Sequence, residues 1–166
     1  MRVMKAIACV VLALTASAAD SNVKGIFGWV ETVAVGTQRI VMMAKLDTGA
    51  TTSSLHATSI QRFRRSGKRF VRFTLSDGNG GLGPSLEQPL VRVVRIKKHT
   101  GDYERRPVIR LPVCLGDLEH VVEFSLVDRS NFDQPVLLGR SALSGFALVD
   151  PQIDSTTPPM CEAAAS

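Results

Sequence analysis

Short runs of β-branched and aromatic residues, separated by turn-forming residues, extend through most of this chain and limit the folds open to it. The run at residues 26–35 is followed by the turn Gly36-Thr37-Gln38 and a second run at residues 39–46, which predicts a β-hairpin. Little of the sequence has the hydrophobic period of a helix. The chain is therefore predicted to be all-β, a closed barrel or sandwich of short strands with one short helix near the C-terminus.

The remaining elements are predicted from the same pattern. Strands are expected at residues 60–63 and 69–75 around Ser66-Gly67, at 89–98 and 108–115 around a tip at 99–103, and at 121–127, 136–140 and 146–149. Residues 141–144 form the predicted helical turn. Residues 76–85 contain four glycines and are predicted to be a mobile loop without regular structure.

The two ends of the chain are predicted to lie outside the folded domain. Residues 1–19 have the basic, apolar and small-residue layout of a secretory signal peptide, so the mature protein is expected to be periplasmic or secreted. Their apolar part is shorter than the ~20 residues of a membrane span, and no later stretch approaches that length. Residues 20–150 are expected to form one domain, and the Pro-, Thr- and Ala-rich residues 151–166 a disordered tail.

The charge of the chain gives little sign of a nucleic-acid partner. Without the two basic residues of the signal segment, the excess of positive charge over the 15 acidic residues is mild. Six basic residues nevertheless gather in one stretch, where they form either a solvated hairpin face or a docking site for an anionic envelope surface or acidic substrate. They are Arg62, Arg64, Arg65, Lys68, Arg69 and Arg72.

Two cysteines remain after removal of the signal segment. In an oxidising compartment Cys114 and Cys161 are able to form a bridge between the domain and its tail. The apolar run Val113-Cys114-Leu115 fits a buried free thiol equally well, so both states stay open.

An acidic residue stands where one of the predicted strands ends. The apolar run at residues 40–44 leads into Asp47-Thr48-Gly49-Ala50, which places a carboxylate at the strand exit, in a turn that glycine enters easily. A reactive carboxylate is expected at such a position. Residues 50–56 are rich in hydroxyl groups that are able to donate hydrogen bonds around it.

Six blocks of sequence occur in an order that resembles one known family. They are residues 28–31, 44–57, 71–73, 106–108, 123–126 with 128–129, and 138–140 with 149–150. Asp-Thr-Gly-Ala after an apolar strand and the later Leu-Leu-Gly-Arg resemble the two signature elements of retropepsin-like aspartic proteases. The narrower resemblance, over about residues 26–150, is to a bacterial family labelled ATP-dependent zinc protease, for which retropepsin-like is the better-founded description.

The resemblance implies an aspartic endopeptidase acting on peptide or protein substrates. Such hydrolysis uses two carboxylates that share one proton across a bound water. Because the chain has a single Asp-Thr-Gly, the second carboxylate is expected from another copy, in a homodimer that pairs two Asp47 residues. Thr48 would form hydrogen bonds across this pair, and Gly49 would allow close approach of the substrate.

The same resemblance suggests which segments bind substrate. Ala50, Gly101 and Tyr103 are the predicted substrate-binding residues. The hairpin tip at residues 97–104 is the expected flap, and the glycine-rich residues 77–83 are the alternative.

The resemblance also assigns a supporting role to residues 138–140. Leu138 and Gly139 are expected to pack beneath the catalytic loop. Retroviral relatives carry an acid that pairs with the arginine, whereas Thr51 and Thr52 stand at those places here. Arg140 is therefore expected to pair with another acid, Glu123 or Asp128.

No metal or cofactor is expected. The histidines His56, His99 and His120 lie outside any His-Glu-x-x-His helix, and the sequence has no P-loop for ATP. The alternative function is a non-catalytic module of the same fold that binds a peptide or a cell-envelope partner. In that case Asp47 would be a structural residue bonded to turn amides.

Overall fold

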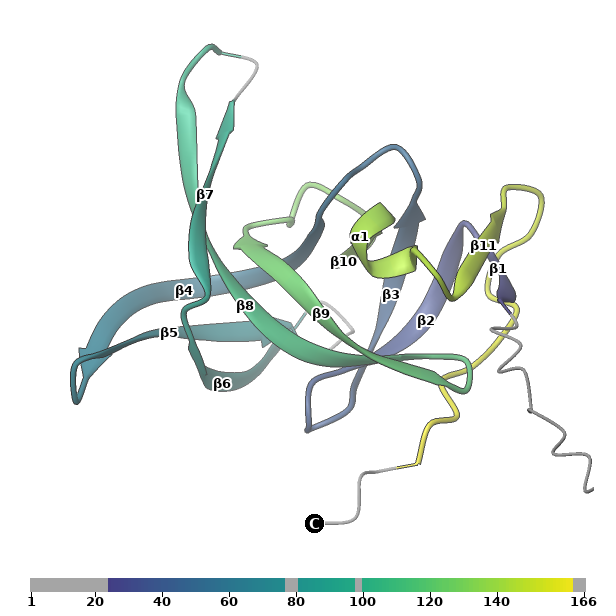
Figure 1. Ribbon diagram of the computed structural model, residues 1–166, viewed down its shortest axis with the longest axis horizontal. Helices are drawn as coiled ribbons and strands as arrows, with labels where there is room; N and C mark the ends of the chain where they lie inside the picture. Colours follow the sequence, from purple (N-terminus) through teal and green to yellow (C-terminus); the bar gives the residue numbers. More distant parts are fainter. Residues whose placement is uncertain (1–23, 77–80, 98–99, 163–166) are drawn as a thin grey trace, which may run out of the picture.

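The computed structural model describes residues 24–76, 81–97 and 100–162, so the predicted signal peptide lies outside the described residues. Within these ranges the chain forms eleven strands and one short helix (Figure 1). In order they are β1 (Gly25–Gly28), β2 (Val30–Val35), β3 (Ile40–Asp47), β4 (Ser53–Arg65), β5 (Lys68–Ser76), β6 (Leu82–Pro89), β7 (Arg92–Lys97), β8 (Tyr103–Leu115), β9 (Leu118–Val127), β10 (Val136–Gly139), α1 (Arg140–Leu143) and β11 (Ala147–Asp150).

Six of the strands close into a barrel. Their order is β10-β3-β2-β8-β9-β4, and β4 pairs with β10 again through Val136 opposite Leu55 and Leu137 opposite Ser54. β10 runs parallel to β3 and antiparallel to β4, so it is inserted between two strands that lie early in the chain. Closure leaves no free edge in the barrel wall. The predicted all-β fold with a closed barrel and one short helix is confirmed.

The alternation of side chains along β3 explains both the core and the placement of Asp47. Met42, Ala44 and Leu46 are at most 3% exposed and point into the barrel. Because neighbouring residues of a strand face opposite sides, Lys45 and Asp47 share the outer face. The core is completed by apolar residues from the other barrel strands, among them Val33, Leu55, Ile109, Phe124 and Leu138.

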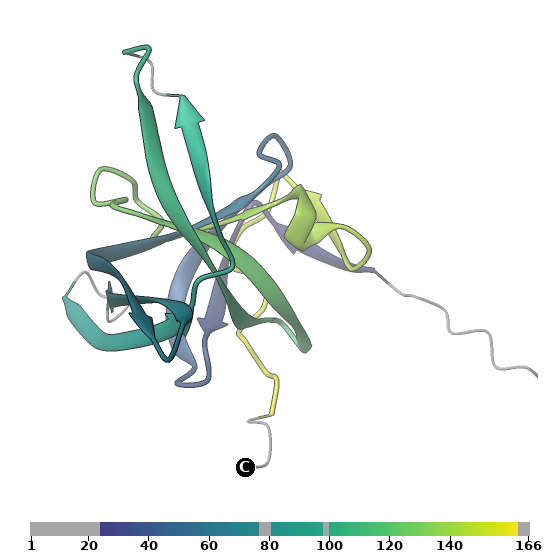
Figure 2. The same cartoon turned by 60° about the vertical axis from the view of Figure 1, so that its left-hand side comes forward.

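Two arms extend from the barrel. β4 continues beyond it and pairs with β5, to which β6 is added, and the β7–β8 hairpin projects away from the barrel wall (Figures 1 and 2). The prediction of a loop without regular structure at residues 76–85 is wrong for its last part, since Leu82 begins β6; residues 77–80 lie outside the described part. Pro84 is tolerated because β6 is the last strand of the sheet, where one side needs no partner.

The C-terminal segment is held against the domain. β11 runs parallel to β1, and beyond it Trp29 N donates to Ile153 O at 3.1 Å while Ser155 N donates to Val30 O at 2.7 Å. The expectation of disorder from residue 151 is therefore wrong for residues 151–162. The composition of the segment did not show the hydrogen bonds that fix it.

A buried carboxyl group anchors this segment. Glu31 is 0% exposed, and its Oε1 accepts a hydrogen bond from Gly28 N at 2.7 Å. Its Oε2 accepts from Thr156 N at 2.9 Å and Thr157 N at 3.3 Å, and the Thr156 hydroxyl donates to Oε1. A buried acid is stable only when such donors surround it, so Glu31 and residues 156–157 fix each other.

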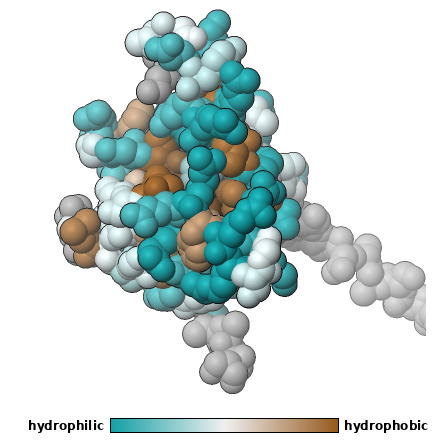
Figure 3. Space-filling view, turned by 90° about the vertical axis from the view of Figure 1, so that its left-hand side faces the viewer, coloured by the Kyte–Doolittle hydropathy of each residue, from teal (hydrophilic) through white to brown (hydrophobic). Residues whose placement is uncertain are grey.

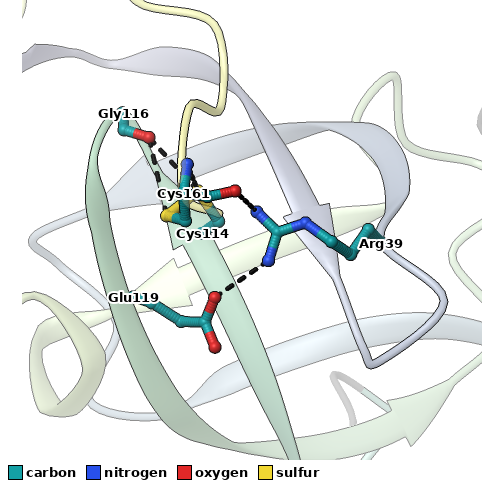
Figure 4. Close-up of a disulfide and its surroundings, with 5 residues drawn as sticks. All are labelled: Arg39, Cys114, Gly116, Glu119 and Cys161. Atoms are coloured by element: carbon teal, nitrogen blue, oxygen red, sulfur yellow. Dashed lines mark hydrogen bonds and ion pairs between the residues drawn. A yellow bond between two sulfur atoms is a disulfide. The ribbon is translucent and has the colours of Figure 1, made fainter. Parts of the chain in front are cut away.

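The cysteines form a disulfide between Cys114 and Cys161, so the free-thiol alternative is excluded. Figure 4 shows the bridge where the last described residues meet the end of β8. Arg39 donates to Cys161 O at 2.6 Å and to Glu119 at 2.9 Å, which ties the β2–β3 turn to the same place. In the described part of the chain, no helix is both long and apolar enough to cross a membrane.

Candidate active site

Asp47 ends β3, and its carboxylate is held by the turn that follows. Oδ1 accepts hydrogen bonds from Gly49 N at 2.9 Å and Ala50 N at 3.1 Å. Oδ2 lies 3.3 Å from the ammonium group of Lys45, two residues earlier on the same face of the strand. The Asp47 side chain is 23% exposed, so it stays open to solvent and to a ligand.

These contacts determine the ionisation of Asp47. Partial burial raises the pKa of its carboxyl group, but the Gly49 and Ala50 amides and the Lys45 ammonium outweigh burial, and the pKa lies below its ordinary value. In a single chain Asp47 is therefore a carboxylate at neutral pH. It is able to accept a proton from a water molecule but has none to donate.

β10 lies directly beneath the Asp47 turn. Leu138 is paired with Leu46 and Gly139 with Asp47, and Leu138 is 1% exposed. A Cβ atom at Gly139 would stand 2.7 Å from Thr52 O, so only glycine lets the two backbones approach this closely. Gly139 N also donates to Ser53 Oγ at 3.1 Å.

Arg140 braces the same turn from α1. One guanidinium nitrogen, Nη1, donates to Thr48 O at 2.9 Å and Gly49 O at 2.7 Å, and Nη2 donates to Thr51 Oγ1 at 2.8 Å. The expectation of an acidic partner for Arg140 is wrong. With threonines where an acid would stand, carbonyl and hydroxyl oxygens accept its hydrogen bonds instead.

The two acids expected beside Arg140 are engaged elsewhere. Glu123 pairs with Arg92 and Arg110. Asp128 accepts a hydrogen bond from Ser130 N at 2.9 Å and lies 3.6 Å from His56 Nδ1. The Ser130 amide and hydroxyl lower the pKa of Asp128, with a smaller contribution from His56.

The outer surface of the turn is left uncovered. Thr48 and Gly49 are exposed, and Ala50 is half-buried. The Thr48 hydroxyl has no hydrogen-bond partner within the described residues. The structure thus gathers Asp47, Thr48, Gly49, Ala50 and residues 138–140 into one unit that presents a single carboxylate.

The structure does not bring the predicted flap residues to Asp47. Gly101 and Tyr103 lie at the tip of the β7–β8 hairpin, which stands apart from the end of β3 in both cartoon views (Figures 1 and 2). Tyr103 is 55% exposed, and the Arg95 guanidinium carbon lies 4.5 Å from its ring centre. The alternative flap, residues 77–83, falls largely outside the described residues.

In the hydroxyl-rich segment after the turn, Ser53 and Ser54 accept hydrogen bonds from β10 and Arg129 and do not bond to the Asp47 carboxylate. Arg129 is 7% exposed and donates to Ser54 Oγ at 2.9 Å and Gln134 O at 3.2 Å. Burial lowers the pKa of Arg129, as does nearby Arg106, while Asp47 opposes this change. In the sequence Arg129 is recognisable only as part of a motif, because nothing local indicates that an arginine in a polar loop is buried.

The histidine nearest to Asp47 in sequence does not contact it. His56 Nδ1 instead accepts a hydrogen bond from Arg129 N at 2.8 Å. Within residues 24–76, 81–97 and 100–162, no three His, Cys, Asp or Glu side chains converge in a way that could hold a metal ion.

A closed barrel with Asp-Thr-Gly at one strand end, braced by a Gly-Arg pair at the end of β10, defines a retropepsin-like domain. Sequence comparison makes this more specific: the family model described as "Retropepsin-like aspartic endopeptidase RimB" matches residues 26–159. The chain therefore belongs to the RimB-like family. The retropepsin-like resemblance is confirmed, whereas none of these matches carries the zinc-protease label.

Curated relatives match the chain over a part of their own length. A protein named "Probable alpha-L-glutamate ligase" from Shewanella pealeana is 38% identical over 110 residues, which is 65% of this chain and 24% of that protein. A protein of the same name from Parasynechococcus marenigrum is 34% identical over 111 residues, 66% of this chain and 24% of the relative. The chain thus spans about a quarter of the length of the curated relatives it matches.

A solved structure of another protein supports the fold, and nearly all of that protein matches this chain. The crystal structure of a Legionella pneumophila protein of unknown function has a TM-score of 0.68 and 36% sequence identity to this chain. The match covers 79% of this chain and 96% of the Legionella protein.

Proposed function

We propose that this chain is an exported aspartic endopeptidase whose active site forms when two copies bring their Asp47 carboxylates together. The observation that carries the proposal is the geometry of the Asp47 turn. Two backbone amides hold Oδ1, and the carboxylate faces outward on a rigid support from β10 and Arg140.

The chemistry requires the second carboxylate. One ionised carboxylate accepts a proton from the attacking water, while a protonated partner donates to the carbonyl oxygen of the scissile bond. Two carboxyl groups in contact share one proton because both cannot remain ionised at short distance. The single ionised Asp47 of one chain supplies the base, and the pair would supply the acid.

Features of the surface support assembly of two copies. Thr48 is exposed with a free hydroxyl among the described residues, as a group that bonds across a dimer would be. On the β1–β11 pair, Ile26 and Leu148 are register partners and are 65% and 51% exposed. An apolar pair of this kind on a two-stranded sheet suits burial against a second copy.

The ligase activity in the relatives' names is not part of this proposal. Those names describe proteins about four times as long as the matched region, and the match covers a quarter of each. Export rests on residues 1–19 of the sequence alone.

The decisive test is Asp47→Asn, compared with Asp117→Asn at an exposed turn as the matched control. Digestion of a peptide library across acidic to neutral pH should be abolished by Asp47→Asn and unaffected by the control, with melting temperatures close to wild type. Cleavage retained by Asp47→Asn would refute the aspartic mechanism, and inhibition by a chelator would indicate metal chemistry. Sedimentation at rising concentration should show a dimer in samples that cleave.

The second candidate is a non-catalytic binding module. It is favoured by one observation: within a single chain Asp47 is already satisfied by two amides and Lys45, as a purely structural residue would be. In that case the protein would stay monomeric at high concentration and would cleave nothing in the same library.

A further inference from the structure

Lys45 is the one charged side chain among the described residues that contacts the Asp47 carboxylate. Its ammonium group lies 3.3 Å from Oδ2, whereas Oδ1 accepts the amide hydrogen bonds of Gly49 and Ala50. The Lys45 side chain is 42% exposed, so the lysine is partly open to solvent. The ion pair is therefore able to form and break without a change in the backbone.

The strand register fixes where Lys45 lies. It is the register partner of Val30 in β2 and of Leu137 in β10, so apolar neighbours flank its aliphatic stem on both sides. Gly139 is the register partner of Asp47 and contributes no side chain on the β10 side of the carboxylate. The space between these neighbours leads the lysine along β3 to the carboxylate two residues later.

The other charged groups near Asp47 do not contact it. Arg140 of α1 donates to carbonyl oxygens of the turn. Arg129, in the loop after β9, responds electrostatically to Asp47, but no hydrogen bond or ion pair joins the two in the described part of the chain. Glu31 of β2 is buried on the opposite face, and His56 of β4 accepts a hydrogen bond from Arg129 N. The charges that face Asp47 are thus positive, and only that of Lys45 reaches the carboxylate.

A proton on Asp47 conflicts with the contacts of its oxygens. On Oδ1 a proton would face two amide N–H donors, and on Oδ2 it would face the ammonium group. The amides are fixed in the backbone of the turn, whereas lysine has a flexible four-carbon stem. Protonation of Asp47 therefore displaces Lys45 rather than the amides.

We propose that Lys45 is a positioning residue that keeps Asp47 ionised in the single chain and withdraws from Oδ2 when two Asp47 carboxyl groups share a proton. The inference rests on the proposed function, since the shared proton belongs to the pair. That proton comes from solvent, and Lys45 keeps its own, so Lys45 acts through its charge alone. Because a nearby cation favours the ionised form, Lys45 lowers the pH range in which the pair holds one proton.

Dimer formation should consequently take up a proton. Where Asp47 of the single chains holds no proton and the pair holds one, each unit of lower pH should strengthen the dimer about tenfold. This dependence should move to higher pH when the charge of Lys45 is removed, since Asp47 then accepts a proton more readily. Sedimentation at a series of pH values measures it without any substrate.

Three variants separate the charge of Lys45 from its bulk. Lys45→Met removes the charge and keeps most of the side chain, and Lys45→Arg restores a cation at the same place. Lys68→Met is the matched control, because Lys68 is exposed at the tip of the β4–β5 hairpin and forms no ion pair among the described residues. Figure 3 faces the side on which this hairpin projects, and hydrophilic residues cover much of it. Loss of one charge there should leave Asp47 unaffected.

The first measurement is the titration of Asp47, followed by NMR of its carboxyl carbon in isotope-labelled protein, with Asp47→Asn to assign the signal. Lys45→Met should raise the midpoint by about 0.5 pH unit, the size expected of a partly exposed ion pair, and salt should reduce the shift. Lys45→Arg and Lys68→Met should keep the wild-type midpoint. The same direction is expected for single chains and for dimers.

The second measurement is the pH profile of peptide cleavage. Both limbs of the kcat/KM profile should move to higher pH in Lys45→Met and stay in place in Lys45→Arg and in the control. A midpoint or a profile that Lys45→Met leaves unmoved would overturn the inference, and a lower rate at an unmoved optimum would assign Lys45 to substrate contact instead. If the wild type cleaves nothing while midpoint and dimer respond to Lys45→Met, the proposed cleavage fails and the link between Lys45 and the Asp47 proton stands.

Discussion

Replacement of Arg140 by lysine tests how far the Arg140 side chain stabilises the Asp47 turn. Arg140 donates three side-chain hydrogen bonds, to Thr48 O, Gly49 O and Thr51 Oγ1, and the single ammonium of lysine is able to keep about one of them. Two backbone bonds remain, from residue 140 N to Ala50 O and from Ser141 N to Thr51 O. The turn should therefore loosen without being lost.

The expected loss of stability follows from the number of hydrogen bonds removed. An exposed hydrogen bond contributes about 0.5–1 kcal/mol net, so losing two should lower the local stability of the turn by about 1–2 kcal/mol. Hydrogen exchange of the Gly49 and Ala50 amides reports this directly, because both donate to Asp47 Oδ1. Their exchange should accelerate about tenfold, since 1.4 kcal/mol corresponds to a factor of ten.

Arg110→Lys is the matched control. Arg110 is also exposed and also donates through its guanidinium group, but to Glu123 on the barrel wall. It should leave the exchange of Gly49 and Ala50 unchanged. The bracing role would be refuted if Arg140→Lys left both amides as protected as in the wild type, or if the control accelerated them equally.

Two further predictions concern stability. Replacing both Cys114 and Cys161 by serine should lower the free energy of unfolding, measured by urea denaturation, by up to about 4 kcal/mol. This is the chain-entropy value for a bridge over 47 residues. An unchanged free energy of unfolding would show that the hydrogen bonds of the C-terminal segment are sufficient without the bridge. Because the pKa of Asp47 is lowered from 3.8, its ionised form stabilises the fold above that pH and the contribution disappears as pH falls through the folded-state pKa. The stability difference between wild type and Asp47→Asn should shrink below about pH 4, and a difference that grows in acid would contradict the hydrogen bonding described here.

Local sequence patterns were sufficient to predict most of the hairpins. The β2–β3, β4–β5 and β7–β8 pairs follow from alternation and turn residues that lie within a few positions of each other. The Asp47 turn could be predicted for the same reason, because a strand, an acid and a glycine are adjacent in sequence.

The features that were missed depend on residues far apart in the chain. The acceptors of Arg140, and the threonine donors that fix Glu31 to the C-terminal segment, lie about 90 to 125 positions away, so no local window contains both partners. β6 forms despite its glycine and two prolines because β5 supplies its hydrogen bonds. The basic residues of β4 and β5 were visible in the sequence. That Glu87 pairs with Arg65 and Arg72, and not with Arg64, follows only from the register of β4, β5 and β6.

The insertion of β10 between β3 and β4 has a consequence for when the Asp47 turn becomes ordered. A chain is made from its N-terminus, so Asp47 emerges long before Arg140, whose bond to Thr48 O joins residues 92 positions apart. Contacts of this range form slowly, because the intervening chain must first lose its freedom. A partly made chain therefore carries an unsupported acidic turn. Its residues are synthesised well before the residue that fixes them in place.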